Sequence, residues 1–176
     1  MNIYEDIAKR TNGEIYIGVV GPVRSGKSTF VKKFMDSFVI PNIEASYDKE
    51  RARDETPQSG SGKTIMTTEP KFIPDEAVKV SIGASNMKVR LIDCVGYMVE
   101  GAMGAFDDDG PRMVMTPWDK KPMEFERAAE YGTKKVICDH STVGIVVTTD
   151  GTIGEIPRAS YEGAEERVIN ELKGLN

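Results

Sequence analysis

The sequence predicts an α/β fold with a mostly parallel sheet, and three observations support this prediction. An apolar, β-branched segment at 14–20, EIYIGVV, leads into a glycine-rich turn and then into apolar residues at helical spacing. Two further segments, 76–96 and 141–151, contain the apolar runs expected of strands. Helical patterns separate the strands, and such alternation is typical of a sheet with helices packed on its faces.

Composition narrows the class of protein. With 176 residues, 39% of them hydrophobic and 29% charged, the chain has the size and composition of one folded domain, expected to span 1–176. Its net charge of −5 argues against a nucleic-acid partner. No apolar run approaches roughly 18 residues, so we expect no transmembrane segment. Cys94 and Cys138 do not form a CxxC pair, and we expect two buried thiols in a cytoplasmic protein.

The first half of the chain contains the clearest strand–turn–helix pattern. After the first strand and the turn GPVRSGKST, residues 30–39 carry apolar side chains at helical spacing, and Pro41 ends the segment. Residues 44–63 are polar and charged, so we expect a loop with room for one helical turn in YDKERARDE. Segments 76–83 and 87–96 flank the turn GASN and predict an antiparallel hairpin.

The second half of the chain begins with an irregular stretch. Residues 97–122 hold several glycines, an acidic triplet and TPW, so we expect a long mobile or functional loop. Within it, Asp107–Asp109 should be solvated and Trp118 should be a packing residue. The remaining elements are predicted as a helix at 125–140, a strand at 141–151 and a helix from Tyr161 to Leu172.

The turn at 21–28 fits the phosphate-binding loop template G-x-x-x-x-G-K-[ST], between a strand and a helix as the template requires. Its glycines let backbone N–H groups turn toward a phosphate, Lys27 can reach the β- and γ-phosphates, and the Ser28 hydroxyl can ligate Mg²⁺. Arg24 could face a γ-phosphate or pair with an acid, and the sequence leaves both open. The predicted nucleotide contacts in this loop are Gly21, Arg24, Ser25, Gly26, Lys27, Ser28 and Thr29.

A second Gly-Lys-Thr stretch, SGSGKT at 59–64, fails the same template. Pro57 stands where the first glycine belongs, no apolar strand precedes the stretch, and no helical pattern follows it. Lys63 is therefore either a solvated loop side chain or a contact to a phosphate or a neighbouring subunit.

A D-x-x-G sequence, DCVG at 93–96, stands at the end of an apolar strand. In P-loop NTPases an aspartate there holds Mg²⁺, usually through water, and the glycine N–H can read the γ-phosphate, which makes Asp93 and Gly96 candidates. Thr67 and Thr68 lie where the GTPase-like branch places a threonine that ligates Mg²⁺ in the triphosphate state. The predicted catalytic set is Lys27, Thr67, Thr68 and Asp93, and the predicted metal ligands are Ser28, Thr68 and Asp93.

Two GTPase features are missing from the sequence. Tyr97 follows the D-x-x-G sequence where many GTPases carry a water-orienting glutamine, and 97–176 contains no glutamine. The N-K-x-D motif that reads guanine is also absent, so these residues leave the base open.

Five segments together resemble a known family: GEIYIGVVGPVRSGKSTFVKKFM, SGSGKTIMTTEPKF, LIDCVGY, GPRMVMTPW and STVGIVVTTDGTIGEIPR. They are similar to the N-terminal domain of the stage IV sporulation protein A family of endospore-forming bacteria, over nearly the whole chain. The family's proteins are much longer, so we expect this chain to be a fragment. The resemblance implies a P-loop NTPase with a three-layer fold, related to the translation-factor class of GTPases.

The resemblance also implies a function. It implies ATP with Mg²⁺, with Lys27 as the phosphate-loop lysine, Asp93 at the metal site, and Thr67 and Thr68 sensing the γ-phosphate and coupling hydrolysis to assembly. It further implies self-polymerisation into the basement layer of the spore coat, in the mother-cell cytoplasm at the forespore surface. The implied partners are spore-coat proteins and a small membrane-anchoring peptide, bound through regions that this chain lacks.

Three alternatives to an ATPase stay open on the residues alone. One is a GTP-dependent switch, and another is a structural module that binds nucleotide without turnover. A small-molecule kinase is a remote third, because no acceptor site is evident.

Overall fold

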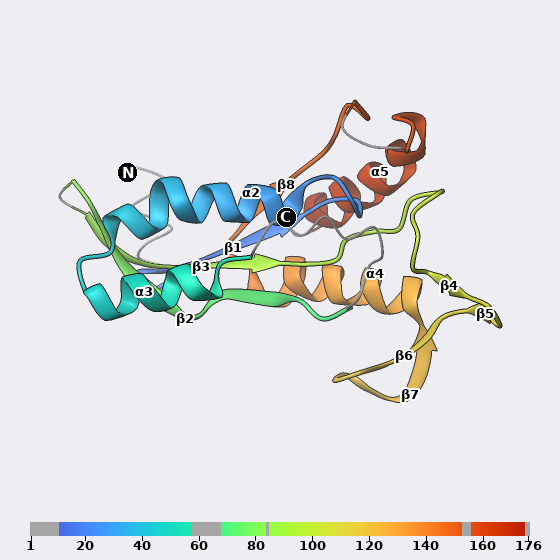
Figure 1. Ribbon diagram of the computed structural model, residues 1–176, viewed down its shortest axis with the longest axis horizontal. Helices are drawn as coiled ribbons and strands as arrows, with labels where there is room; N and C mark the ends of the chain where they lie inside the picture. The colour runs from blue at the N-terminus through green and yellow to red at the C-terminus, as the bar shows by residue number, and fades with distance from the viewer. Residues whose placement is uncertain (1–10, 58–67, 84, 153–155, 175–176) are drawn as a thin grey trace.

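The computed structural model describes residues 11–57, 68–83, 85–152 and 156–174, which form an α/β structure (Figure 1). The elements along the chain are β1 (Glu14–Val20), α2 (Lys27–Phe34), α3 (Ser46–Glu55), β2 (Lys71–Ile82), β3 (Ser85–Asp93), β4 (Phe106–Asp107), β5 (Gly110–Pro111), β6 (Met113–Thr116), β7 (Asp119–Glu124), α4 (Phe125–Lys135), β8 (Val143–Val146) and α5 (Ala159–Lys173). A π-helical turn and a 3₁₀ turn extend α2 to Asn42, and a π-helical turn extends α4 to His140.

The main sheet has the strand order β2-β3-β1-β8. Strand β1 is parallel to both of its neighbours, and β2 pairs antiparallel with β3. The predicted hairpin and the mostly parallel sheet are therefore confirmed. In this register Val19 lies opposite Asp93 on one side and Ile145 on the other. Strands β1 and β3 are parallel, so their carboxyl ends lie side by side. The glycine-rich turn after β1 is therefore close to Asp93, the last residue of β3.

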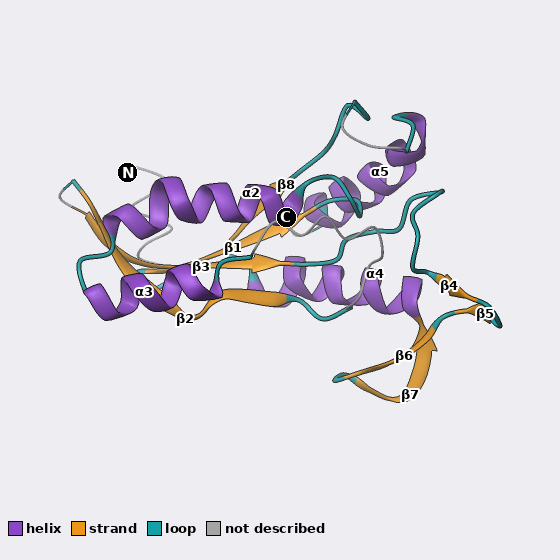
Figure 2. Ribbon diagram, in the orientation of Figure 1, coloured by secondary structure: helices purple, strands orange, loops and turns teal. Residues whose placement is uncertain are grey.

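Two hydrophobic cores lie on the two faces of the sheet, between it and the helices (Figure 2). Successive residues of a strand point to opposite faces, so Val19 and Leu91 belong to the core shared with α2 and α3. Val20 and Ile92 belong to the other core, with Phe125 of α4 and residues of α5. The four strand side chains come from β1 and β3, the two central strands, so both cores are built on the middle of the sheet.

The one helical turn allowed in YDKERARDE, within the loop expected over 44–63, is a longer helix than expected, because Ser46–Glu55 forms the ten-residue helix α3. The sequence pattern did not reveal its length because the helix has no apolar stripe: Ala52 is its one buried residue. Its other side chains are mostly charged residues with good helix propensity. They also make contacts beyond the helix, since Arg51 pairs with Glu76 at 3.8 Å and Glu55 accepts the Asp75 N–H at 2.7 Å.

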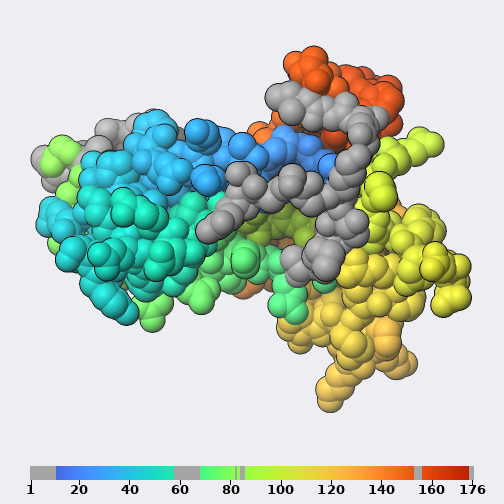
Figure 3. Space-filling view, viewed as in Figure 1, coloured from blue at the N-terminus to red at the C-terminus, as the bar shows by residue number. Residues whose placement is uncertain are grey.

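The expected long loop at 97–122 instead contains two short antiparallel hairpins, β4–β5 and β6–β7. The hairpins protrude from the body of the molecule, as the space-filling view shows at the lower right (Figure 3). Strands this short give too little alternation for sequence to reveal them. Asp107–Asp109 are exposed, as predicted. Trp118 packs as predicted, with its ring 5.7 Å from that of Tyr131.

The last elements follow the prediction with two corrections. The helices predicted at 125–140 and 161–172 are confirmed. The strand expected over 141–151 is only the four residues of β8. Cys94 is buried, but Cys138 is exposed, because Val136 and Ile137 occupy the buried face of that helical turn. None of the helices in the described ranges has the length and apolar composition needed to cross a membrane.

Candidate nucleotide-binding site

The glycine-rich turn joins the end of β1 to the start of α2 in a backbone conformation that its glycines permit. Gly21, Arg24 and Gly26 have φ angles of 146°, 59° and 95°, all in the region that favours glycine. At Gly21 a Cβ atom would also lie 2.2 Å from the Val147 carbonyl oxygen, so no side chain fits there. Helix α2 begins at Lys27, directly after this turn. The N-terminal end of α2 therefore faces the turn, which suits an anion.

Lys27 is folded back into the turn from the first position of α2. Its side chain is only 5% exposed, and its Nζ donates a 2.5 Å hydrogen bond to the Pro22 carbonyl oxygen. Burial lowers the pKa of the Lys27 ammonium, while the nearby Cys94 and Asp93 oppose that shift. A buried cation with one carbonyl partner has donors left over for phosphate oxygens.

Ser28 and Asp93 bring two oxygen-bearing side chains together across the site. The Ser28 hydroxyl donates a 2.6 Å hydrogen bond to Asp93 Oδ2. The other carboxylate oxygen, Oδ1, is buried and has no hydrogen-bond partner within the described part of the chain. Burial raises the pKa of Asp93, and the Ser28 hydrogen bond and Lys27 oppose this. A buried, unpartnered carboxylate oxygen beside a hydroxyl fits Mg²⁺, which usually takes one or two carboxylates together with substrate phosphates.

Gly96 closes the site from the side of β3. It has a φ of 95°, and a Cβ atom there would lie 2.0 Å from the Gly21 carbonyl oxygen and 2.7 Å from Lys27 Nζ. The Gly96 N–H donates a 3.1 Å hydrogen bond to Thr133 Oγ1 of α4. The glycine of the D-x-x-G sequence thus lies directly against the backbone of the glycine-rich turn.

Tyr97, which replaces the glutamine of many GTPases, turns its ring away from the site. Its carbonyl oxygen accepts the Val23 N–H at 2.8 Å, which ties its backbone to the glycine-rich turn. Its ring is 4% exposed and lies under the Arg167 guanidinium of α5, at 5.0 Å. Burial raises the pKa of Tyr97 to about 12. The Tyr97 hydroxyl is therefore a poor acid–base group near neutral pH.

The remaining predicted residues divide into exposed, buried and undescribed ones. Arg24 and Thr29 are exposed on the turn and the first turn of α2, and Ser25 is buried, with its Oγ unpartnered among the residues described. Thr68 is buried, and its carbonyl oxygen packs against Gly132 of α4, where a Cβ atom would lie 3.1 Å away. Thr67 and Lys63, with the second Gly-Lys-Thr stretch, lie outside the described residues.

Thr133 is a site residue that the sequence analysis missed. It is fully buried on the face of α4 that also buries Ala128 and Ala129. Besides accepting from Gly96, its hydroxyl donates to the Ala129 carbonyl oxygen at 2.8 Å. A threonine among alanines on the buried face of a predicted helix is a signal that could have drawn attention to it.

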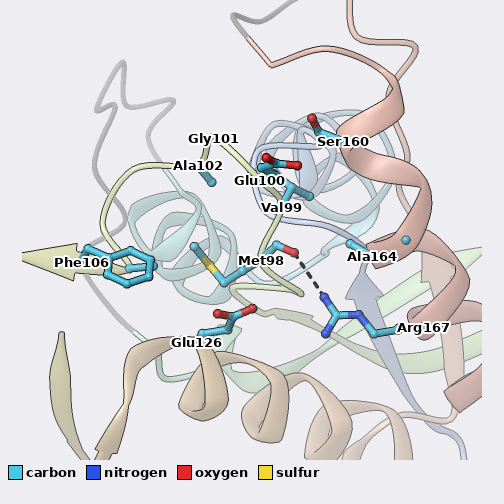
Figure 4. Close-up of a pocket in the computed structure, with 12 residues that line it drawn as sticks. Met98, Val99, Glu100, Gly101, Ala102, Phe106, Glu126, Ser160, Ala164 and Arg167 are labelled. Carbon is cyan, nitrogen blue, oxygen red and sulfur yellow. Dashed lines mark hydrogen bonds between the residues drawn. The ribbon is translucent and has the colours of Figure 1, made fainter. Parts of the chain in front are cut away.

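A separate cavity of about 810 Å³ lies between the segment after Gly96, α4 and α5 (Figure 4). Arg167 crosses one side of it and donates a 3.3 Å hydrogen bond to the Met98 carbonyl oxygen. Arg167 also pairs with Glu130 of α4. These contacts join the segment that follows the D-x-x-G sequence to both helices of this face.

Comparison with known proteins identifies the family. Residues 1–176 match the family model described as stage IV sporulation protein A, ATPase domain. Three curated relatives bear the name stage IV sporulation protein A. That of Clostridioides difficile (strain 630) is 63% identical over 99% of this chain and 36% of its own length. That of Bacillus anthracis is 61% identical, and that of Bacillus subtilis (strain 168) 59%, each over 98% of this chain and 35% of its own length.

No solved structure matches the chain significantly. The chain spans about 35% of the length of the curated relatives it matches. The chain belongs to the stage IV sporulation protein A family, and the part of the family that it matches is the ATPase domain.

Proposed function

We propose that the chain binds Mg²⁺–ATP and that the protein hydrolyses it. The observation that carries the proposal is the Asp93 carboxylate, which is bonded to Ser28 through Oδ2 and has a buried Oδ1 without a described partner. A buried carboxylate oxygen left unpaired costs stability unless a ligand satisfies it. The family name, which includes the word ATPase, supports the same proposal.

The residues would divide the work as follows. Lys27 and the backbone N–H groups of the turn would bind the β- and γ-phosphates, with Gly96 contacting the γ-phosphate from the other side. Ser28, Asp93 and Thr68 would hold Mg²⁺. When bound, the metal neutralises charge that develops on the phosphate oxygens. Water would attack the γ-phosphorus as the bond to the β–γ bridging oxygen breaks, giving ADP and phosphate.

We propose that the fold is a P-loop three-layer fold related to the translation-factor class of GTPases. The two cores on opposite faces of the sheet fit three layers. The antiparallel edge strand β2 beside β3 fits the GTPase-like branch of that class, in which the D-x-x-G sequence follows a hairpin. Mostly parallel sheets of this kind bind ligands at the carboxyl ends of their strands, where Lys27 and Asp93 lie.

Turnover should be slow. The Tyr97 ring is packed under Arg167, so the residue after the D-x-x-G sequence has no side chain available to orient water. We propose that Thr67 and Thr68 sense the γ-phosphate and that its loss releases their segment. Hydrolysis would then be coupled to a conformational change, and rearrangement of the site would limit the rate of turnover.

The role of the whole protein is proposed from the family. The name of the relatives places them in sporulation. We propose that the longer protein assembles with itself into the basement layer of the spore coat, at the forespore surface in the mother-cell cytoplasm. Its spore-coat partners and a small membrane-anchoring peptide would bind regions outside this chain.

Titration calorimetry with a non-hydrolysable ATP analogue and with the matching GTP analogue, each with and without Mg²⁺, tests the proposal. We expect Mg²⁺-dependent binding that prefers ATP, and loss of at least roughly a hundredfold in affinity for Lys27→Ala. Lys33→Ala, an exposed lysine of the same helix, is the control and should bind normally.

Each other outcome has a definite meaning. Preference for the GTP analogue would indicate a GTP-dependent switch. Binding without phosphate release from ATP would indicate a structural nucleotide module. An ATP affinity in Lys27→Ala close to that of the wild type would contradict the assignment of the site.

A further inference from the structure

The Thr133 hydroxyl donates one hydrogen bond and accepts another. It donates its only proton to the Ala129 carbonyl oxygen one turn earlier in α4, at 2.8 Å. Its oxygen can still accept hydrogen bonds, and the Gly96 N–H donates one to it, with 3.1 Å between the nitrogen and the oxygen. Both groups are buried, with Thr133 fully inaccessible to solvent. In this structure the Gly96 N–H is therefore satisfied by α4 and not by the glycine-rich turn.

Gly96 is nevertheless part of the wall of the phosphate site. The position of a Cβ atom on Gly96 lies 2.7 Å from Lys27 Nζ and 2.0 Å from the Gly21 carbonyl oxygen. A γ-phosphate that reaches Lys27 thus comes close to this residue. One N–H makes one strong hydrogen bond, so the Thr133 hydroxyl and a γ-phosphate oxygen are competing acceptors for the same donor.

We infer that Thr133 is a positioning residue that sets the preference of the site between nucleoside triphosphate and diphosphate. Its hydroxyl holds the Gly96 N–H on α4, and binding of a triphosphate must break this bond before the γ-phosphate can accept it. A diphosphate lacks the competing oxygen and leaves the bond in place. The inference rests on the proposed function, because it assigns a role within the same nucleotide site.

A neighbouring contact supports the choice of α4 as the element that responds. Gly132, the residue before Thr133, packs against the Thr68 carbonyl oxygen. Two consecutive residues of α4 therefore make these contacts: Thr133 contacts Gly96, and Gly132 contacts Thr68, one of the two predicted sensor threonines. A shift of α4 that follows release of the Gly96 N–H would therefore be transmitted to Thr68 through its contact with Gly132.

The test compares the dissociation constants for ATPγS and ADP, with Mg²⁺, in the wild type, Thr133→Val and Thr133→Ser. Valine keeps the volume and removes the hydroxyl, which leaves the Gly96 N–H with only the weakly accepting Cys94 sulfur as a partner outside the triphosphate complex. We expect affinity for ATPγS relative to ADP to rise by roughly tenfold in Thr133→Val, because a poorly paired buried donor is costly in the other states. Thr133→Ser keeps the acceptor, so its ratio should equal that of the wild type.

A second measurement needs no variant. In the wild-type protein the amide resonance of Gly96 should shift strongly on addition of ATPγS and remain nearly unchanged with ADP. An unchanged ratio in folded Thr133→Val, or a Gly96 resonance that responds equally to both nucleotides, would overturn the inference and leave the proposed function standing. Failure of the wild type to bind either nucleotide would overturn both.

Discussion

The Ser28 hydroxyl donates a 2.6 Å hydrogen bond to the Asp93 carboxylate, which joins the first turn of α2 to the end of β3 across 65 residues of sequence. The bond holds the Ser28 hydroxyl and the Asp93 carboxylate, the two proposed Mg²⁺ ligands, next to each other. It also leaves the second Asp93 oxygen buried and without a described partner. The folded protein thus keeps a costly arrangement at this point, and the predictions that concern Asp93 follow from that cost.

Replacing Asp93 by asparagine should improve nucleotide-free stability at neutral pH while it removes Mg²⁺-dependent nucleotide binding. Burial raises the pKa of Asp93 in the folded state, so the folded protein holds this proton more tightly than the unfolded chain does. The wild type therefore loses stability relative to Asp93→Asn as the pH rises through the folded-state pKa. Below about pH 4 both states are protonated and the difference vanishes.

Urea unfolding of the two proteins between pH 4 and pH 8 measures this difference. Asp109→Asn, which changes an exposed aspartate of the β4–β5 turn, is the matched control. A variant at Asp93 that is less stable than the wild type at pH 7 would show that the carboxylate is not a cost to the fold.

Adding one methyl group at Gly96 should damage the site. A Cβ atom there would collide with the Gly21 carbonyl oxygen at 2.0 Å, at a φ of 95° that already disfavours side chains. We expect Gly96→Ala to lower the free energy of unfolding by about 3 kcal/mol or more and to weaken nucleotide binding. Gly101→Ala is the control, because its φ is 86° but the space around it is open. It should cost only about 1 kcal/mol. Equal losses in the two variants would mean that Gly96 is not held against the turn.

Removing both candidate sensor threonines should separate binding from turnover. Thr67→Ala combined with Thr68→Ala keeps Lys27 and Asp93, so the affinity for Mg²⁺–ATP should change by less than about tenfold. The rate of phosphate release under saturating ATP should fall by at least roughly a hundredfold, since the lost interactions belong to the reacting state. An unchanged kcat would remove the sensor role from both residues.

The two cysteines should differ sharply in reactivity. Cys138 is exposed, whereas Cys94 is buried, with its Sγ 3.3 Å from the Val19 carbonyl oxygen. Burial raises the pKa of the Cys94 thiol, which keeps it in the less reactive thiol form. A thiol reagent should therefore modify one cysteine quickly in the native protein and the second only after unfolding. Cys138→Ser should abolish the fast phase, and a fast phase that survives would place the reactive thiol at Cys94.

Sequence alone predicted the parts of the site that are encoded locally. The turn at 21–28 could be assigned because its template is contiguous and its flanking strand and helix are strongly patterned. The full length of helix α3 could not be predicted beyond one helical turn, because Ala52 is its one buried residue and its contacts to β2 include polar ones. The contact between Gly96 and Thr133 spans 37 residues and depends on how α4 packs on the sheet. Such a pairing follows from tertiary structure and not from any spacing in the chain.

Trp118 lies next to Gly132, close to the contact between α4 and Thr68. It is the only tryptophan in the chain, and its ring carbons lie within 3.4 and 3.5 Å of the Cβ position of Gly132, the same position that the Thr68 carbonyl oxygen approaches. Indole emission is sensitive to its immediate surroundings, and here those surroundings include the helical step next to Thr133. The protein therefore carries a built-in optical reporter at the meeting point of α4, the Thr68 segment and the β6–β7 hairpin, readable without any label.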